Sequence, residues 1–379
     1  MSSMVCATVS ASEAAASVGV RGAFTRPLYV SKMRMALLCC VSALMGLGNP
    51  AFAQPLPQYT IPELAAAIGE GQLGRIAVLA AEQQGKRVYL ERFDGETAGS
   101  PVDIRSAGKS ITALAVGAAI ADGALADTNV PVWPYLGSPR GEPWDAITVG
   151  DLLGVSSAID CNDWERNSPG QEERMYRKRE WHEFALALPA REYVRDGRGE
   201  GPFSYCTAGV FLLGQVVEKA TGERFDAYVQ RRLFDPLGID GVVWRRSRSG
   251  EIQSGGQLTI DAKALLKIGR MVLDGGRWQG EEILPESWIE SMLVPRHRLG
   301  EHVYYGNLWW AVPIRSPRGY ESAWMMKGNG GNIVALVPAY DAVLVVQARN
   351  YNHKDADRHA FTALAAMLTN LDEPAPIAE

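Results

Sequence analysis

The sequence predicts an α/β protein of the α+β type, in which helices flank an antiparallel sheet and a mostly helical lobe is inserted. Two observations predict this fold. Short runs rich in β-branched and aromatic residues occur at residues 74–93 and again at 307–349, whereas apolar runs of helical length fill the middle. Strands at both ends of a chain favour one sheet built from the N- and C-terminal segments and covered by terminal helices.

The first elements follow from local patterns. Residues 62–68 predict a short helix, because proline is tolerated at the first helical position. The β-like runs 74–81 and 86–93 predict a hairpin. A strand-like segment at 102–105 then leads into the apolar run that begins at residue 111, which predicts a buried helix ending near Gly123.

The middle of the chain alternates helices with polar connections. Residues 127–141 are rich in proline and glycine and predict a loop. Residues 160–180 are polar without a clear period, and we interpret them as a long loop over a pocket. Long ordered loops are often functional lids, although a surface loop without a role is the alternative. The helices predicted in this region are 147–153, 181–188, 208–221, 225–234, 260–273 and 286–293.

Beyond the last of these helices the chain becomes β-like, and a terminal helix is predicted at 355–371. The cleft between the sheet and the helical lobe, about residues 125–255, is where a binding site is expected. Ser106 lies at the junction that leads into this lobe. The consecutive antiparallel strands are predicted at 307–313, 323–327, 333–337 and 342–349.

Residues 1–53 have the layout of an N-terminal extension with an export signal. Two basic residues precede the apolar stretch 35–47, and Ala51-Phe52-Ala53 supplies the small residues of a cleavage site. The apolar stretch is too short to span a bilayer as a helix. We therefore expect cleavage after Ala53, a periplasmic or secreted protein without stable membrane insertion, and a single domain over residues 54–379.

Charge and cysteine usage narrow the function classes. The 379 residues carry a net charge of −5 without a basic stripe, which disfavours nucleic-acid binding. No Cys/His grouping has metal-ligand spacing, so neither a metal nor another cofactor is expected. After the leader only Cys161 and Cys206 remain, and in an exported chain they predict one disulfide, with two buried thiols as the alternative. The histidines, scattered among charged residues, are interpreted as surface residues: His182, His297, His302, His353 and His359.

The stretch Arg105-Ser106-Ala107-Gly108-Lys109 carries the strongest chemical signal. A serine and a lysine three residues apart share one face of a helix. A buried amine beside a hydroxyl can lose its proton and then accept one from the serine. Free backbone N–H groups at the first helical turn can hold a developing oxyanion. The pattern predicts a nucleophile and a base, although a serine N-cap followed by a solvated lysine is the alternative.

Three segments together resemble the serine β-lactamase and penicillin-binding superfamily, most closely the class C β-lactamases with their esterase and D-aminopeptidase relatives. The Ser106 to Lys109 stretch is similar to the Ser-x-x-Lys element, and Tyr205-Cys206-Thr207 stands where the family carries Tyr-x-Asn. Asn329-Gly330-Gly331 aligns with the family's Lys-Thr-Gly or His-Ser/Thr-Gly triplet. The likeness covers most of residues 60–370 and implies a β-lactamase/transpeptidase-like fold.

The resemblance implies acyl transfer through a covalent intermediate. Ser106 would attack the carbonyl, and Lys109 with Tyr205 would handle the proton, without the sequence deciding which of the two is the base. The backbone N–H groups of Ser106 and Asn332 would hold the oxyanion. The residues implied in substrate binding are Thr207, Asn329, Gly330, Gly331 and Lys327.

Two departures from the family pattern bear on the substrate. If residues 327–331 continue a strand, Lys327 and Asn329 share one face and the glycines admit a substrate; a glycine-rich hairpin turn is the alternative. Thr207 replaces asparagine, and Asn329 replaces a basic residue that would hold a substrate carboxylate. Both changes argue against efficient β-lactam processing.

We therefore expect a small ester or amide substrate, and a carboxylesterase first. An amidase on short linear amides, resembling the 6-aminohexanoate-dimer hydrolases, or a weak β-lactamase or D-aminopeptidase comes second. A non-catalytic binding protein with the same fold is the alternative of another class.

Overall fold

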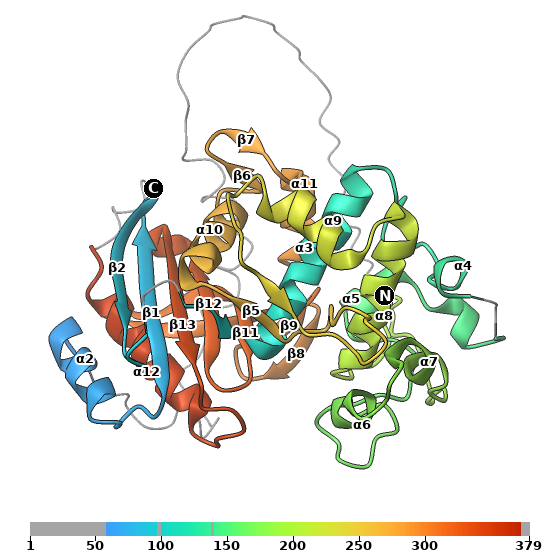
Figure 1. The fold of residues 1–379 in the computed structure, drawn as a ribbon, viewed down its shortest axis with the longest axis horizontal. Coiled ribbons are helices and arrows are strands. Elements are labelled where there is room, and N and C mark those ends of the chain that lie inside the picture. The colour runs from blue at the N-terminus through green and yellow to red at the C-terminus, as the bar shows by residue number, and fades with distance from the viewer. Residues whose placement is uncertain (1–57, 97–99, 138–139, 373–379) are drawn as a thin grey trace, which may run out of the picture.

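The computed structural model describes residues 58–96, 100–137 and 140–372. Within them an antiparallel eight-stranded sheet has the order β2-β1-β13-β12-β11-β10-β9-β8. The N-terminal strand β1 pairs with the last strand β13, which confirms the sheet predicted from both chain ends (Figure 1). The strands are β1 (Ile76–Gln83), β2 (Lys86–Arg92), β8 (His297–Gly300), β9 (Val303–Gly306), β10 (Trp309–Ser316), β11 (Gly319–Gly328), β12 (Asn332–Val337) and β13 (Ala342–Ala348).

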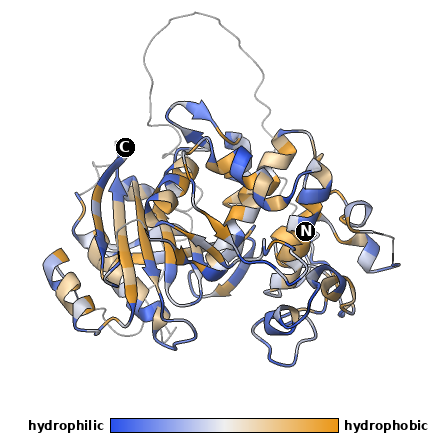
Figure 2. Ribbon diagram, viewed as in Figure 1, coloured by the Kyte–Doolittle hydropathy of each residue, from blue (hydrophilic) through white to orange (hydrophobic). Residues whose placement is uncertain are grey.

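Both faces of the sheet are buried because its central strands are apolar on both sides. Strand side chains alternate between faces, so Val343 and Val345 of β13 enter one core while Leu344 and Val346 enter the other. Many residues of the central strands are coloured hydrophobic in Figure 2. One core is closed by α2 (Ile61–Gly69) and α12 (Ala356–Thr369), and the other by α10 (Ala262–Leu273).

The helical lobe packs around α8, which contacts α3, α4, α5, α7 and α9. Gly222 ends α8 in the left-handed conformation that favours glycine, with φ of 71°. Most of the lobe lies on the right of Figure 1, opposite the sheet. Its helices are α3 (Lys109–Ala121), α4 (Trp133–Leu136), α5 (Val149–Leu153), α6 (Glu172–Tyr176), α7 (Trp181–Leu186), α8 (Thr207–Thr221), α9 (Phe225–Val229) and the π-helical turn Gln230–Phe234.

Several short elements differ from the sequence prediction. The predicted loops 127–141 and 160–180 contain α4 and α6, which are too short to produce a visible helical period. The predicted helix 260–273 begins only at Ala262, because Asp261 caps it and residue 260 belongs to a strand. The strand-like segment predicted at 102–105 contains β3 (Val102–Asp103). The strands that were not predicted are β8, β9, β4 (Val243–Trp244), β5 (Leu258–Ile260), β6 (Arg277–Trp278) and β7 (Glu281–Glu282).

The surface assignment of the histidines is wrong for His359, which is buried in α12 and lies close to Gly74. The predicted disulfide is confirmed: Cys161 and Cys206 are bonded, with their Cα atoms 5.3 Å apart. The predicted leader and cleavage site lie outside the described residues. No helix in the described part of the chain has the length and apolar character needed to cross a membrane.

Candidate active site

Ser106 is presented by a tight turn between β3 and α3. Residues Arg105–Gly108 form one 3-10 turn, and the α-helix begins directly afterwards at Lys109. Arg105 has φ of 54°, a left-handed conformation that is unfavourable for a residue with a side chain. Its carbonyl accepts a hydrogen bond from the Gln257 backbone at 3.0 Å, which helps to hold the turn. The local strain therefore lies immediately before the serine.

Lys109 is buried and reaches the Ser106 hydroxyl. Its Nζ lies 3.1 Å from Ser106 Oγ, 2.8 Å from Thr207 Oγ1 and 2.7 Å from the Gly255 carbonyl oxygen. The residue is 1% exposed, so the alternative of a solvated lysine is wrong. Burial lowers the pKa of the Lys109 amine, opposed by the negative charges of nearby carboxylates. This environment favours the neutral amine, which is the form that can accept a proton.

Tyr205 lies two residues before α8, with its ring close to the same lysine. The Lys109 Nζ is 5.0 Å from the centroid of the Tyr205 ring. Burial raises the pKa of the Tyr205 phenol well above its usual value, and a hydrogen bond with Ser106 opposes that rise. The exposed Trp164 stacks on the Tyr205 ring with the two centroids 5.2 Å apart. The phenol therefore stays protonated and can act as a proton donor.

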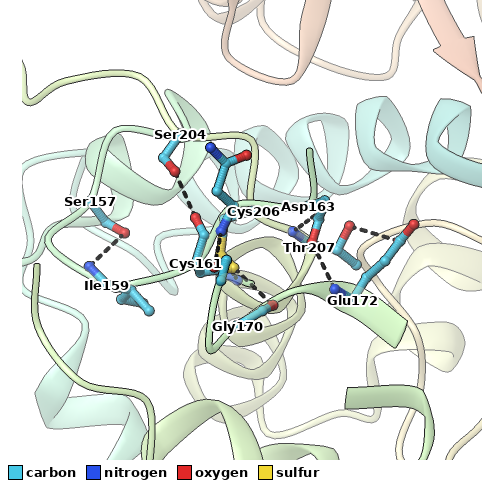
Figure 3. The surroundings of a disulfide bond; sticks show 12 residues. Ser157, Ile159, Cys161, Asp163, Gly170, Glu172, Ser204, Cys206 and Thr207 are labelled. Carbon is cyan, nitrogen blue, oxygen red and sulfur yellow. Dashed lines mark hydrogen bonds between the residues drawn. A yellow bond between two sulfur atoms is a disulfide. The ribbon is translucent and has the colours of Figure 1, made fainter. Parts of the chain in front are cut away.

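Two carboxylates that the sequence did not point to, Asp163 and Glu172, form hydrogen bonds at the start of α8. Asp163 accepts hydrogen bonds from the backbone N–H groups of Thr207 and Glu172, at 2.8 and 2.9 Å. Burial raises the pKa of Asp163 to about 6. Figure 3 shows these bonds beside the Cys161–Cys206 disulfide, which joins the same two segments. The polar stretch 160–180 gave no periodic signal that could have singled out the two carboxylates.

The third segment forms a hairpin turn, so the strand assignment is wrong. Strand β11 ends at Gly328, and residues 329–331 connect it to β12. The side chains of Lys327 and Asn329 consequently have different partners. Lys327 forms an ion pair with Asp357 at 2.7 Å, whereas the Asn329 amide donates to Asn352 Oδ1 at 2.6 Å.

The two glycines of this turn have a packing role. Gly330 and Gly331 have φ of 89° and 85°, and both are buried. A Cβ on Gly330 would lie 2.7 Å from the Tyr351 ring, and one on Gly331 would lie 2.9 Å from the Ala356 carbonyl oxygen. The turn, and not a substrate in contact with a strand, accounts for glycine at these positions.

A pocket of about 60 Å³ opens beside Ser106. Asn329 is among its lining residues, together with Ser106. Asn332 is 1% exposed, and its side-chain amide is bonded to the carbonyl oxygens of Asn329 and Ala348. Neither Asn332 nor Lys327 belongs to the described residues that line this pocket. The complete lining is Arg105, Ser106, Glu172, Glu173, Tyr176, Gly255, Gly256, Gln257, Asn329, Tyr351 and Asn352.

Gly256 brings a second unpredicted segment against the serine turn. It has φ of 134°, and a Cβ there would lie 2.9 Å from the Arg105 carbonyl oxygen. A Cβ on Gly108 would in turn lie 3.2 Å from the Gly256 Cα. The Gly255-Gly256 pair just before the Asp261 helix cap was the available sequence signal, since adjacent glycines mark close backbone approach.

A model of the Beta-lactamase family matches residues 63–367. The chain belongs to the beta-lactamase family. Members of this family are serine hydrolases that act on amide or ester bonds. The family assignment confirms the resemblance inferred from the motifs at Ser106 and Tyr205.

Individual relatives agree with the family assignment. The chain is 29% identical over 196 residues to a 6-aminohexanoate-dimer hydrolase of Paenarthrobacter ureafaciens, and the match spans half of each chain. A putative 6-aminohexanoate-dimer hydrolase from Bacillus anthracis has a similar structure, with a TM-score of 0.64, 15% identity, and coverage of 89% of this chain and 94% of that one. A D-stereospecific amidohydrolase from Streptomyces sp. has a TM-score of 0.59 and 18% identity, with coverage of 79% and 97%. The structural likenesses confirm the fold.

Proposed function

We propose that the protein hydrolyses an amide bond of a short linear substrate through an acyl-enzyme on Ser106. The observation that carries the proposal is the buried Lys109 amine, 3.1 Å from the Ser106 hydroxyl oxygen. A desolvated amine within hydrogen-bond reach is an arrangement that activates a serine nucleophile. Ser106 Oγ attacks the carbonyl carbon, and Lys109 accepts the hydroxyl proton.

The oxyanion of the tetrahedral intermediate needs two donors aimed at one point. The Ser106 N–H supplies the first. For the second we propose the backbone of Asn329, because it lines the same pocket as Ser106, in place of the Asn332 N–H suggested by the motif alignment. Asn332 is buried at the start of β12, where it pairs with Gly328.

Tyr205 favours an amide over an ester as the substrate. An amine leaving group must be protonated as it departs, whereas an alkoxide or phenoxide leaves more easily. The buried Tyr205 phenol stays protonated, so it can donate to the amine and be reprotonated from Lys109. The names of two relatives, a 6-aminohexanoate-dimer hydrolase and a D-stereospecific amidohydrolase, support the same bond type.

A carboxylesterase is the second candidate, and the contacts of Thr207 favour it. The Thr207 hydroxyl already bonds Lys109 and Glu172, at 2.8 and 3.2 Å. Threonine has no side-chain amide and its hydroxyl is already bonded, so this position has no free group to hold the amide of a substrate. The same contacts argue against efficient β-lactam hydrolysis.

A substrate panel separates these functions. The kcat/KM of the protein would be compared on the linear dimer of 6-aminohexanoate, a p-nitrophenyl ester and a chromogenic cephalosporin, with Ser106→Ala as the control. We expect hydrolysis of the amide and the ester, slow or no cleavage of the cephalosporin, and no activity in Ser106→Ala. Cleavage of the ester alone would leave the carboxylesterase, and no hydrolysis of any substrate would favour a binding protein.

A further inference from the structure

The Thr207 hydroxyl links the catalytic lysine to a carboxylate. Thr207 Oγ1 accepts a hydrogen bond from Lys109 Nζ at 2.8 Å and donates one to Glu172 Oε2 at 3.2 Å. A hydroxyl can accept and donate at once, and its proton can rotate between partners. A continuous hydrogen-bonded chain therefore runs from Ser106 through Lys109 and Thr207 to Glu172.

Glu172 also borders the space in which a deacylating water would approach. It is partly buried and lines the same pocket as Ser106. Its Oε2 accepts a further bond from the Tyr176 hydroxyl at 3.0 Å. Glu172 thus contacts the proton chain through its carboxylate and also lines the pocket that Ser106 lines.

Two features hold Glu172 in this position from the backbone. The Asp163 carboxylate accepts hydrogen bonds from the backbone N–H groups of Glu172 and Thr207. It therefore holds both residues of the Thr207–Glu172 contact in place. The Cys161–Cys206 bond ties the two segments together a few residues away (Figure 3). Asp163 is a positioning residue, because it bonds these backbone groups and not the hydroxyl of Ser106.

We propose that Glu172 is the general base of deacylation, connected to Ser106 by a relay through Thr207 and Lys109. A water in the pocket gives a proton to the Glu172 carboxylate as its oxygen bonds to the acyl carbonyl carbon. The bond between that carbon and Ser106 Oγ then breaks and the carboxylic acid leaves. The proton passes from Glu172 to Thr207, from Thr207 to Lys109 and from Lys109 to Ser106, which restores the starting state. The inference rests on the proposed acyl-enzyme mechanism.

The test is a burst experiment with p-nitrophenyl acetate on Glu172→Gln. Glutamine keeps the size and an acceptor oxygen but cannot take the proton. We expect a burst of about one equivalent of p-nitrophenol at the wild-type rate, followed by a steady-state rate about 10²–10⁴-fold lower, the usual contribution of a general base. Mass spectrometry should find the acetyl group on the Ser106 peptide.

Two further variants make the result specific. Thr207→Val removes the relay hydroxyl at nearly constant volume and should also accumulate acetylated Ser106. Glu165→Gln changes an exposed carboxylate of the same loop, bonded to the Asn162 side chain, and should turn over as the wild type does.

Wild-type deacylation in Glu172→Gln would overturn the proposal, as would a burst slowed as much as the steady state. Failure of the wild-type protein to acylate would instead overturn the proposed function.

Discussion

At the scale of single residues, Lys109 and Tyr205 both contact Ser106 but respond differently to burial. Burial favours the neutral form of each group, which lowers the pKa of the amine and raises the pKa of the phenol. The neutral amine has a lone pair for a proton, whereas the neutral phenol has a proton to give. These environments support the proposal that Lys109 is the base and Tyr205 the acid, a choice that the motif alone left open.

The pH dependence of amide hydrolysis tests this assignment. The value of kcat/KM should rise with pH as Lys109 loses its proton, with a midpoint below the ordinary lysine pKa of about 10.4. Tyr205→Phe should keep this rising limb of the pH–rate profile but reduce the kcat/KM for the amide more than that for the ester. The check is a pH–rate profile of both proteins on both substrates; loss of the limb in Tyr205→Phe would instead make the phenol the base.

The sequence predicted only part of these residues, for a physical reason. Ser106 and Lys109 are neighbours on one helical turn, so their spacing carries the information. Asp163 and Glu172 instead form hydrogen bonds with Thr207, which lies 44 and 35 residues further along the sequence. Such contacts depend on how the polar loop folds back, and no local period encodes that.

At the scale of elements, the loop that contains α6 is fastened to the start of α8. The Cys161–Cys206 disulfide and the bonds of Asp163 fix it beside Tyr205 and Thr207. The disulfide was predictable because only two cysteines remain after the expected leader of an exported chain. The hairpin turn at 329–331 was not, because a glycine-rich segment fits a turn or a strand edge equally well until the register of β11 and β12 is known.

Removing the disulfide should affect both stability and catalysis. In the double variant Cys161→Ser/Cys206→Ser we expect a loss of about 2–4 kcal/mol in the free energy of unfolding. We also expect a lower kcat, because the loop no longer holds Asp163 and Glu172 against Thr207. Urea unfolding and steady-state kinetics measure the two effects, and reduced wild-type protein is the matched control. An unchanged kcat in the double variant would show that the disulfide between the loop and the start of α8 has no part in catalysis.

At the scale of the whole molecule, Arg270 of α10 joins both ends of the chain. Its guanidinium is buried and lies 2.6 Å from the Glu82 carboxylate of β1 and 2.6 Å from the Asp341 carboxylate at the turn before β13. The helix thereby links the two neighbouring strands that join the N-terminal and C-terminal parts of the sheet. The strand positions predicted this sheet, whereas the ion pairs could not be predicted without the order of its strands.

Arg270→Ala should be strongly destabilising, because it leaves Glu82 buried without its partner. A loss of about 3–5 kcal/mol in the free energy of unfolding is expected for a broken buried ion pair. The control is Arg277→Ala, which breaks an exposed pair with Glu282 and should change little. Equal urea midpoints for the two variants would contradict this account of how the chain ends are joined.

We propose that Ser106 is a nucleophile activated by the buried Lys109, a claim that covalent labelling can test in one experiment. The protein would be incubated with a fluorophosphonate probe and followed by mass spectrometry. We predict one adduct, located on the Ser106 peptide, absent in Ser106→Ala and formed far more slowly in Lys109→Met. An adduct on another residue, or labelling of Ser106→Ala at the wild-type rate, would contradict the claim.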